Sequence, residues 1–281
     1  MLAVAATVLA WGGSYTAIRI ALSGLTPVEI AALRYFAAAV VGAIFLAAVR
    51  TRVPSRSQFA RLAAVGILYV VGFAVLLNLG QQTVSAGTAS FIVGTLPVMI
   101  AIMASIALGE PFGRLSWLGA LVSLTGVGVI AFGSGDTLTL EFGVFLVLGA
   151  ALAASAASIV QKPLLADFSS LVLTAWILTL GVVPLLPVLP RAIGVLASAA
   201  PEVIWAVAFL AIASTIIGYV GWSVALKRMP AGRAGSFLNC VPLAATAIGF
   251  VWLGEVPTVA GFVGGLVALS GVVIVNAARG R

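Results

Sequence analysis

The chain has 281 residues, of which 63% are hydrophobic and 7% are charged. A soluble domain carries roughly a quarter charged residues, so this composition excludes an ordinary water-soluble domain and predicts a protein surrounded by lipid. The net charge of +7 would suit a nucleic-acid partner. However, the Lys and Arg residues lie in short gaps between apolar runs, which is typical of membrane topology and argues against nucleic-acid binding.

At about 1.5 Å per residue, roughly 20 apolar residues cross the hydrocarbon core of a bilayer. By that measure the sequence predicts ten transmembrane helices. The first five are expected at 2–21, 28–49, 59–79, 84–108 and 115–132, and the second five at 140–160, 171–189, 203–226, 232–253 and 258–277. The runs do not alternate between apolar and polar residues as barrel strands do, so the predicted class is an all-α integral membrane protein.

Positively charged residues predict the orientation. Eleven Lys and Arg residues fall on one side of the predicted bundle, whereas Arg19 and Arg191 fall on the other. Because cytoplasmic loops are enriched in Lys and Arg, both termini are predicted to be cytoplasmic, in a bacterial inner (plasma) membrane. The first apolar run lacks the features of a cleaved signal peptide and is interpreted as a retained helix.

An internal repeat relates the two halves of the chain. At an offset of 145 residues, the segment from Gly87 matches the segment from Gly232. The matched residues are Gly87, Ala89, Pro97, Leu108, Gly109 and Glu110 with Gly232, Ala234, Pro242, Leu253, Gly254 and Glu255, followed by Gly119, Leu121, Leu124, Gly126 and Val127 with Gly264, Leu266, Leu269, Gly271 and Val272. The earlier segments match more weakly, with Arg19 near Lys162 and Arg34 near Trp176.

Each half contains five predicted helices, which is an odd number, so the second half must begin on the opposite side of the membrane. We therefore predict two inverted five-helix repeats, 1–135 and 136–281, related by a pseudo-two-fold axis in the membrane plane. Many secondary transporters have this plan, with the substrate bound near the midplane between the repeats. The repeat is the main argument from the residues for transport.

The duplicated Gly-x-Ala…Pro…Leu-Gly-Glu pattern, with Trp11-Gly12 and Arg34-Tyr35, resembles the EamA family of the drug/metabolite transporter superfamily over essentially the whole chain. The resemblance implies a ten-helix basket around a central cavity. Its walls would come from the third, fourth, eighth and ninth helices, with contributions from the first and sixth, while the fifth and tenth would be peripheral. Among family members, the chain is most similar to bacterial exporters of aromatic and other amino acids.

The expected function is export of small neutral or zwitterionic metabolites, amino acids with aromatic or apolar side chains first, by alternating access. Uncharged drugs or nucleobases are alternative substrates, and a channel or a scaffold that transports nothing is an alternative of another class. The seven acidic residues all lie away from the middle of the predicted helices, which argues against obligate exchange of protons for cations. The absence of paired buried Lys or Arg argues against phosphate-ester substrates.

Polar and aromatic residues of the predicted wall helices are the candidates for substrate binding. Rings can pack on an apolar side chain or attract a cation, and an amide inside the bundle can bind an amino or carboxylate group. The alternatives are an interfacial aromatic belt for the rings and an interhelical hydrogen bond, worth about 0.6 kcal/mol, for the amides. The candidates are Trp11, Tyr15, Tyr69, Phe73, Asn78, Thr95, Trp176, Tyr219, Trp222 and Asn239.

Arg34 lies about 9 Å inside its predicted helix. A charge at that depth needs a partner or water. It could bind a substrate carboxylate, extend to the interface or pair with Glu29, and the structural alternatives are preferred over substrate binding.

Two pairs of repeat-related residues have predicted structural roles. Pro97 and Pro242 should kink their helices and are predicted to act as hinges for alternating access, unless they only shape the helix. Glu110 and Glu255 are predicted to cap backbone amides and hold turns, in preference to gating or proton relay.

The remaining expectations concern partners. Gly261 and Gly265 form a GxxxG that could contact the fifth predicted helix or a second copy of the chain, so a monomer or weak homodimer is expected. With no histidine, one cysteine (Cys240) and no P-loop, we expect no metal, no cofactor and no enzyme. The expected partners are a small-molecule substrate and the lipid bilayer.

Overall fold

The structure is a computed structural model that describes residues 2–49, 51–108, 113–132, 142–228, 237–256 and 258–279. Within these ranges the chain forms helices and no strand. The first half contains α1 (Leu2–Ala21), α2 (Pro27–Val49), α3 (Arg56–Ile67), η1 (Leu68–Val75), α4 (Leu76–Gly80), α5 (Ala86–Val93), α6 (Leu96–Leu108) and α7 (Arg114–Phe132).

The second half contains α8 (Phe142–Asp167), α9 (Ser170–Gly181), η2 (Val183–Val188), α10 (Leu189–Ala197), α11 (Pro201–Phe209), η3 (Leu210–Ile217), α12 (Gly218–Arg228), η4 (Phe237–Cys240), α14 (Val241–Leu253) and α15 (Val259–Arg279). The η1 and η3 segments are π-helices, whereas η2 and η4 are 3-10 helices. The π-helical segments continue without a break from α3 into α4 and from α11 into α12.

Local sequence signals explain where several helices begin. Ser55 forms a capping box with Gln58 at the start of α3, and the side chains of Ser85 and Ser169 cap α5 and α9. Each serine accepts a backbone N–H that the first helical turn would otherwise leave unpaired. Pro201 opens α11, where its missing N–H costs nothing.

Five continuous helical stretches in the described ranges are long and apolar enough to cross a membrane: Pro27–Val49, Arg56–Gly80, Ala86–Ala107, Phe142–Asp167 and Pro201–Arg228. A sixth arises if α9 and the helix that follows it form one span bent by 46°. The helices Val241–Leu253 and Val259–Val275 are apolar but contain fewer than the 18 residues that these candidate spans reach. The structure is thus that of a helical multi-pass membrane protein, while the ten-helix count stays a prediction.

The seventh predicted helix, 171–189, differs in detail from the structure. The α-helix ends at Gly181, and a 3-10 segment leads into a further helix that reaches Ala197. The cause is local, because Pro184 and Pro187 lack the backbone N–H that an α-helix needs. The prolines therefore bend this stretch rather than end it.

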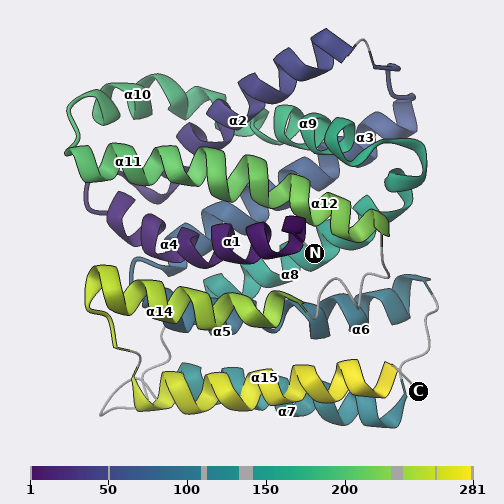
Figure 1. Ribbon diagram of the computed structural model, residues 1–281, viewed down its shortest axis with the longest axis vertical. Helices are drawn as coiled ribbons and strands as arrows, with labels where there is room; N and C mark the ends of the chain where they lie inside the picture. Colours follow the sequence, from purple (N-terminus) through teal and green to yellow (C-terminus); the bar gives the residue numbers. More distant parts are fainter. Residues whose placement is uncertain are drawn as a thin grey trace.

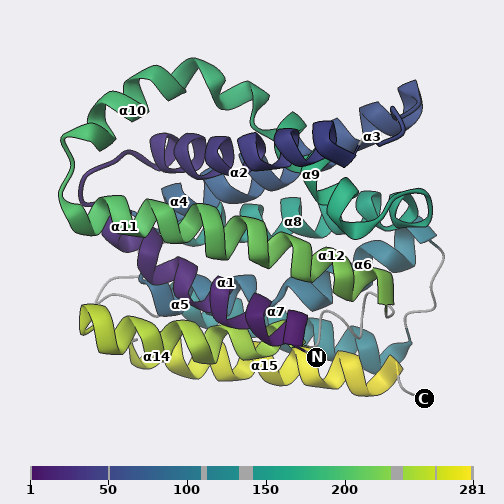
Figure 2. The ribbon, with the colours of Figure 1, turned by 45° about the horizontal axis from the view of Figure 1, so that its top comes forward.

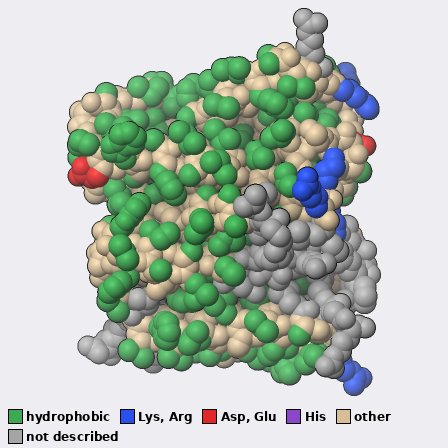
Figure 3. Space-filling model, in the orientation of Figure 1, with side chains coloured by type: hydrophobic (Ala, Val, Ile, Leu, Met, Phe, Trp, Pro, Cys, Tyr) green, Lys and Arg blue, Asp and Glu red, His purple; other side chains and the backbone are tan. Residues whose placement is uncertain are grey.

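The hydrophobic surface and the layered arrangement of helices are typical of a protein surrounded by lipid. Hydrophobic side chains dominate the described surface, and the Lys and Arg side chains seen in Figure 3 gather at its right-hand end. The helices run across the view in stacked layers, with α7 and α15 as an outer pair at the bottom (Figure 1). In the tilted view, the N and C marks lie right of the centre, on the side where Figure 3 shows Lys and Arg side chains (Figure 2).

Glycines bring α7 and α15 into close contact. A Cβ on Gly126 would lie 2.5 Å from the oxygen of Gly264, and one on Gly119 would lie 2.8 Å from the oxygen of Gly271. In the repeat, Gly119 corresponds to Gly264 and Gly126 to Gly271. The contact therefore exchanges equivalent residues, which is the pattern of an antiparallel pair around a two-fold axis.

The GxxxG of Gly261 and Gly265 has a different neighbour from the predicted one. A Cβ on Gly265 would meet the ring of Phe91 in α5 at 2.5 Å, and one on Gly261 would lie 3.1 Å from Thr88 Oγ1. The expectation of contact with the fifth predicted helix was wrong for these two glycines. Gly265 lies on another face of α15 from Gly264, since residues three or four apart share a helix face and residues one apart do not.

The α7–α15 contact gives a direct test. We expect Gly126→Ala to lower the midpoint of thermal unfolding in detergent, because the new Cβ would overlap the backbone nitrogen of Ala268. Such overpacking typically costs about 1–3 kcal/mol. Gly128→Ala on the same helix is the matched control, since nothing lies within 4 Å of a Cβ there. Equal midpoints for the two variants would show that this contact does not limit helix packing.

Candidate functional site

A cavity of about 60 Å³ lies between the two halves of the chain. Its walls come from α1, α2, α4, α8 and α12 and from both π-helical segments. The regions where α5 meets α6 and η4 meets α14 complete the lining. It is lined by Trp11, Ser14, Tyr15, Arg34, Tyr69, Phe73, Leu77, Ser90, Val93, Gly94, Leu96, Ala154, Ser158, Ser214, Tyr219, Trp222, Leu238 and Val241. Most of these side chains are apolar, and Arg34 is the one that carries a full charge.

Aromatic rings form one continuous wall of this cavity. The ring of Tyr219 lies 5.1 Å from that of Tyr69 and 6.0 Å from that of Trp11, both edge-to-face. Trp11 also lies 5.9 Å from Trp222, and Tyr35 packs against Tyr219 from behind at 6.2 Å. These are favourable separations for aromatic pairs, so the wall presents large apolar faces to anything in the cavity.

Hydrogen bonds hold these rings in place. The indole N–H of Trp11 donates to the backbone oxygen of Ser214 at 3.0 Å. The hydroxyls of Tyr35 and Tyr219 are 2.8 Å apart, and those of Tyr69 and Ser158 are 3.0 Å apart. The polar ends of these four rings thereby have partners, which avoids the cost of burying them unpaired.

The two π-helical segments flank the cavity from opposite halves. Tyr69 and Phe73 of η1 line it on one side, and Ser214 of η3 lines it on the other. η1 begins at Leu68 and η3 begins at Leu210, so the two segments are 142 residues apart. Arg34 and Trp176, which match in the weaker part of the repeat, are separated by the same number of residues. π-helical turns occur frequently at functional sites, and nothing in the sequence pattern predicted them here.

Arg34 reaches the cavity from α2 and is only 3% exposed. Its Nε donates to Thr215 Oγ1 and its Nη2 to Ser214 Oγ, each at 3.0 Å. Its guanidinium also lies 4.9 Å from the ring centre of Tyr35. Glu29, one partner considered from the sequence, pairs instead with Arg191 at 3.1 Å.

Helix breaks surround the two repeat-related prolines. Pro97 is the second residue of α6, after a turn at 94–95 that separates it from α5. Pro242 is likewise the second residue of α14, after the η4 turn. A Cβ on Gly94 would lie 3.1 Å from Pro242 Cγ, so the two breaks pack directly against each other, and Gly94 and Val241 line the cavity beside them. Whether they act as hinges stays a prediction.

Six predicted binding residues meet in this cavity: Trp11, Tyr15, Tyr69, Phe73, Tyr219 and Trp222. Asn78 lies elsewhere and donates to the backbone oxygen of Pro27 at 2.9 Å. Thr95 bonds to the oxygen of Ile92 within its turn, and Trp176 packs against Phe59. The side chain of Asn239 and all of Glu110 lie outside the described residues.

The sequence did not single out the cavity serines, which are Ser14, Ser90, Ser158 and Ser214. Serine occurs throughout membrane helices, where its hydroxyl often bonds to the preceding turn. Ser14, for example, donates to the oxygen of Trp11 at 2.7 Å. The residue type therefore carries no signal of position.

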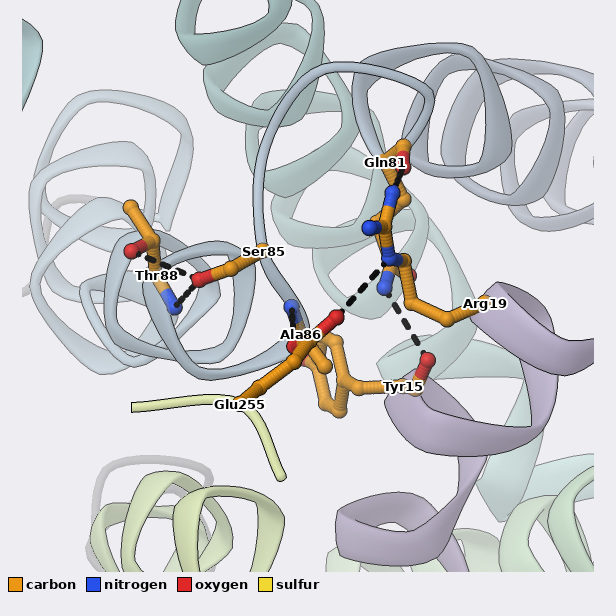
Figure 4. A network of polar contacts seen from close by, with 7 residues as sticks. All are labelled: Tyr15, Arg19, Gln81, Ser85, Ala86, Thr88 and Glu255. Atoms are coloured by element: carbon orange, nitrogen blue, oxygen red, sulfur yellow. Dashed lines mark hydrogen bonds and ion pairs between the residues drawn. The ribbon is translucent and has the colours of Figure 1, made fainter. Parts of the chain in front are cut away.

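An ion pair joins the two halves next to the cavity (Figure 4). Arg19 Nε lies 3.0 Å from Glu255 Oε1, and Arg19 Nη1 donates to the oxygen of Gln81 at 2.9 Å. Gln81 donates in turn to the backbone oxygen of Tyr15, whose side chain lines the cavity. Glu255 also accepts the backbone N–H of Ala86 at 3.0 Å, so its carboxylate caps the first turn of α5.

A glycine turns Glu255 toward this network. Gly254 has φ 64°, in the left-handed region, and follows the last residue of α14. Its N–H donates to the oxygen of Phe250. Glycine adopts this conformation without the steric cost of a Cβ, so the duplicated Leu-Gly-Glu motif has a physical basis in its second copy.

The sequence matches the EamA-like transporter family over residues 1–132 and again over residues 141–277. The chain belongs to this family. Several named transporters align over most of its length. One, from Streptantibioticus cattleyicolor, is named a probable terminal-alkyne amino-acid exporter and is 32% identical over 98% of this chain and 92% of its own length.

Other similar proteins carry less specific names. An uncharacterized transporter from Archaeoglobus fulgidus is 31% identical over 97% of this chain and 96% of its own. YdfC of Bacillus subtilis, also an uncharacterized transporter, is 29% identical over 93% and 86%. A crystal structure aligns with a TM-score of 0.67 at 18% identity, covering 97% of this chain and 94% of that one, and shows a shared fold.

In this EamA protein, Arg19 and Glu255 should be energetically coupled. Their side chains are 34% and 20% exposed, so solvent screens the pair only in part. We expect a double-mutant cycle of Arg19→Met and Glu255→Gln, followed by thermal unfolding in detergent, to give a coupling of about 1 kcal/mol. The double variant would then lose less stability than the two single losses combined. Strict additivity would contradict the coupling.

Proposed function

We propose that this EamA protein exports small neutral or zwitterionic metabolites, and first among them amino acids with aromatic or apolar side chains. The observation that carries the proposal is the buried cavity between the halves, walled by Trp11, Tyr69, Tyr219 and Trp222. Such rings favour an apolar or aromatic side chain. The name of the Streptantibioticus relative, a probable amino-acid exporter, points to the same substrate class.

We infer that transport proceeds by alternating access between two inverted five-helix repeats, 1–135 and 136–281. The two-fold exchange of glycines between α7 and α15 supports this relation, as does the presence of one π-helical segment in each half, 142 residues apart. We further propose ten spans with both termini in the cytoplasm of a bacterial cell, a topology that the repeat and the Lys and Arg residues gathered at one end of the molecule support.

The cavity is contracted in this conformation. Its volume of about 60 Å³ is well below the roughly 300–1,000 Å³ of ligand pockets. A substrate would therefore need the walls to separate. The π-helical segments and the breaks before Pro97 and Pro242 are the places where the α-helical hydrogen-bond ladder is already interrupted, and we propose that the walls move there.

Uptake by the purified protein in liposomes tests the function. Each amino acid would be offered with and without a pH gradient, and protein-free liposomes serve as the control. We expect saturable uptake of apolar and aromatic amino acids without the gradient, and counterflow when the lumen is preloaded. A strict need for the gradient would overturn the uncoupled mechanism. Flux that never saturates would favour a channel, and no flux of any solute would favour a scaffold.

Filling the cavity should stop transport. Ala154 lines the cavity from α8, so a phenylalanine at this position would fill the space. We expect Ala154→Phe to lower the initial rate of uptake at least about tenfold. A tenfold loss corresponds to about 1.4 kcal/mol of transition-state stabilisation. Leu152→Phe is the matched control, because Leu152 lies on the same helix and is 44% exposed. Thermal unfolding of both variants would confirm that they are folded. Normal transport by folded Ala154→Phe would place the substrate path elsewhere.

A further inference from the structure

Arg34 is a buried cation whose hydrogen-bond partners are all neutral. The two described ion pairs of the protein, Arg19–Glu255 and Arg191–Glu29, involve more exposed arginines. Arg34 is 3% exposed and donates only to two hydroxyls. Within the described ranges no carboxylate lies at ion-pair distance from it. A charge buried in this way is costly unless an opposite charge or water compensates it.

The hydroxyls of η3 orient the guanidinium. Thr215 Oγ1 donates its own proton to the oxygen of Leu210 at 2.8 Å, so it faces Arg34 Nε as an acceptor. Ser214 Oγ accepts from Nη2. Of the five N–H donors of an arginine, these bonds use two. The other three, including both on Nη1, have no protein acceptor in the described part of the chain.

The unused donors suit a carboxylate. Nη1 and Nη2 form a planar fork that binds the two oxygens of a carboxylate bidentately. This guanidinium borders the cavity next to the aromatic wall, which would hold an apolar side chain of the same ligand. By contrast, no Asp or Glu occurs among the described residues that line the cavity. An amino group would therefore meet no carboxylate among these residues.

We propose that Arg34 binds the substrate's carboxylate, that Ser214 and Thr215 position it, and that the amino group is dispensable. The substrates would then be apolar or aromatic carboxylates, with amino acids as one case among them. This inference rests on the proposed transport function for its biological meaning. Binding is nevertheless measurable in detergent without transport, so the two can fail separately.

Three probes that differ in one group each test this on the unmodified protein. They are L-phenylalanine, 3-phenylpropionate, which lacks the amino group, and L-phenylalaninamide, which lacks the carboxylate. At pH 7.5 in detergent, we expect the first two to raise the midpoint of thermal unfolding in a saturable way and the amide to leave it unchanged. Equal stabilisation by the amide would overturn the proposal, and so would stabilisation by phenylalanine but not by phenylpropionate.

Variants then assign the effect to the guanidinium. We expect Arg34→Gln to weaken binding of both carboxylate probes at least about 30-fold, and Arg34→Lys to retain part of it, since lysine keeps the charge but not the fork. Ser214→Ala should weaken carboxylate binding less than Arg34→Gln. Arg191→Gln is the matched control, an exposed arginine outside the cavity, and should bind both probes normally.

The outcomes separate the two proposals. Unchanged binding of phenylalanine by folded Arg34→Gln would overturn the role of Arg34. If that variant does not fold, the three probes on the unmodified chain still decide the question. Failure of every apolar carboxylate to bind would overturn this inference, whereas saturable uptake of an uncharged solute would still leave the transport function in place.

Discussion

The structure depends on how one guanidinium is kept inside a bundle of apolar helices. Arg34 is accommodated because η3 turns the hydroxyls of Ser214 and Thr215 toward it, and because the ring of Tyr35 lies beside it. The same π-helical segment offers the carbonyl of Ser214 to Trp11. The η3 segment thus binds both the guanidinium of Arg34 and the indole of Trp11 in the aromatic wall. In a regular α-helix the carbonyl of Ser214 would accept a hydrogen bond within the helix, and serine and threonine hydroxyls often bond to the preceding turn.

Close packing and open space are divided between different helices. Where α7 meets α15, glycines let the backbones approach so closely that a Cβ would overlap its neighbours. Contacts of this kind drive helix association in lipid, where the hydrophobic effect gives little preference for one apolar neighbour over another. Neither α7 nor α15 is among the described elements that line the cavity, where large rings face one another. This glycine contact and the cavity therefore lie in separate parts of the helix bundle.

The Arg19–Glu255 network connects this centre to one end of the molecule. It joins α1, the turn between α4 and α5, and the turn after α14, so it spans both halves of the chain (Figure 4). Tyr15 belongs both to the network, through its backbone oxygen, and to the cavity lining, so the network directly adjoins the site. Glu255 combines a capping bond with an ion pair, and only the first was considered from its motif.

The sequence alone determined that the chain lies in lipid, where most helices run, that its halves repeat and that it resembles EamA transporters. Those properties follow from long apolar runs and from motif spacing, which are local. Only the tertiary structure decided which side chains meet: Trp11 and Tyr219 face the cavity, whereas Trp176 and Asn78 do not, and Arg34 does. The physical reason is that lipid and protein interior are equally apolar, so periodicity cannot tell the inward face of such a helix from the outward one.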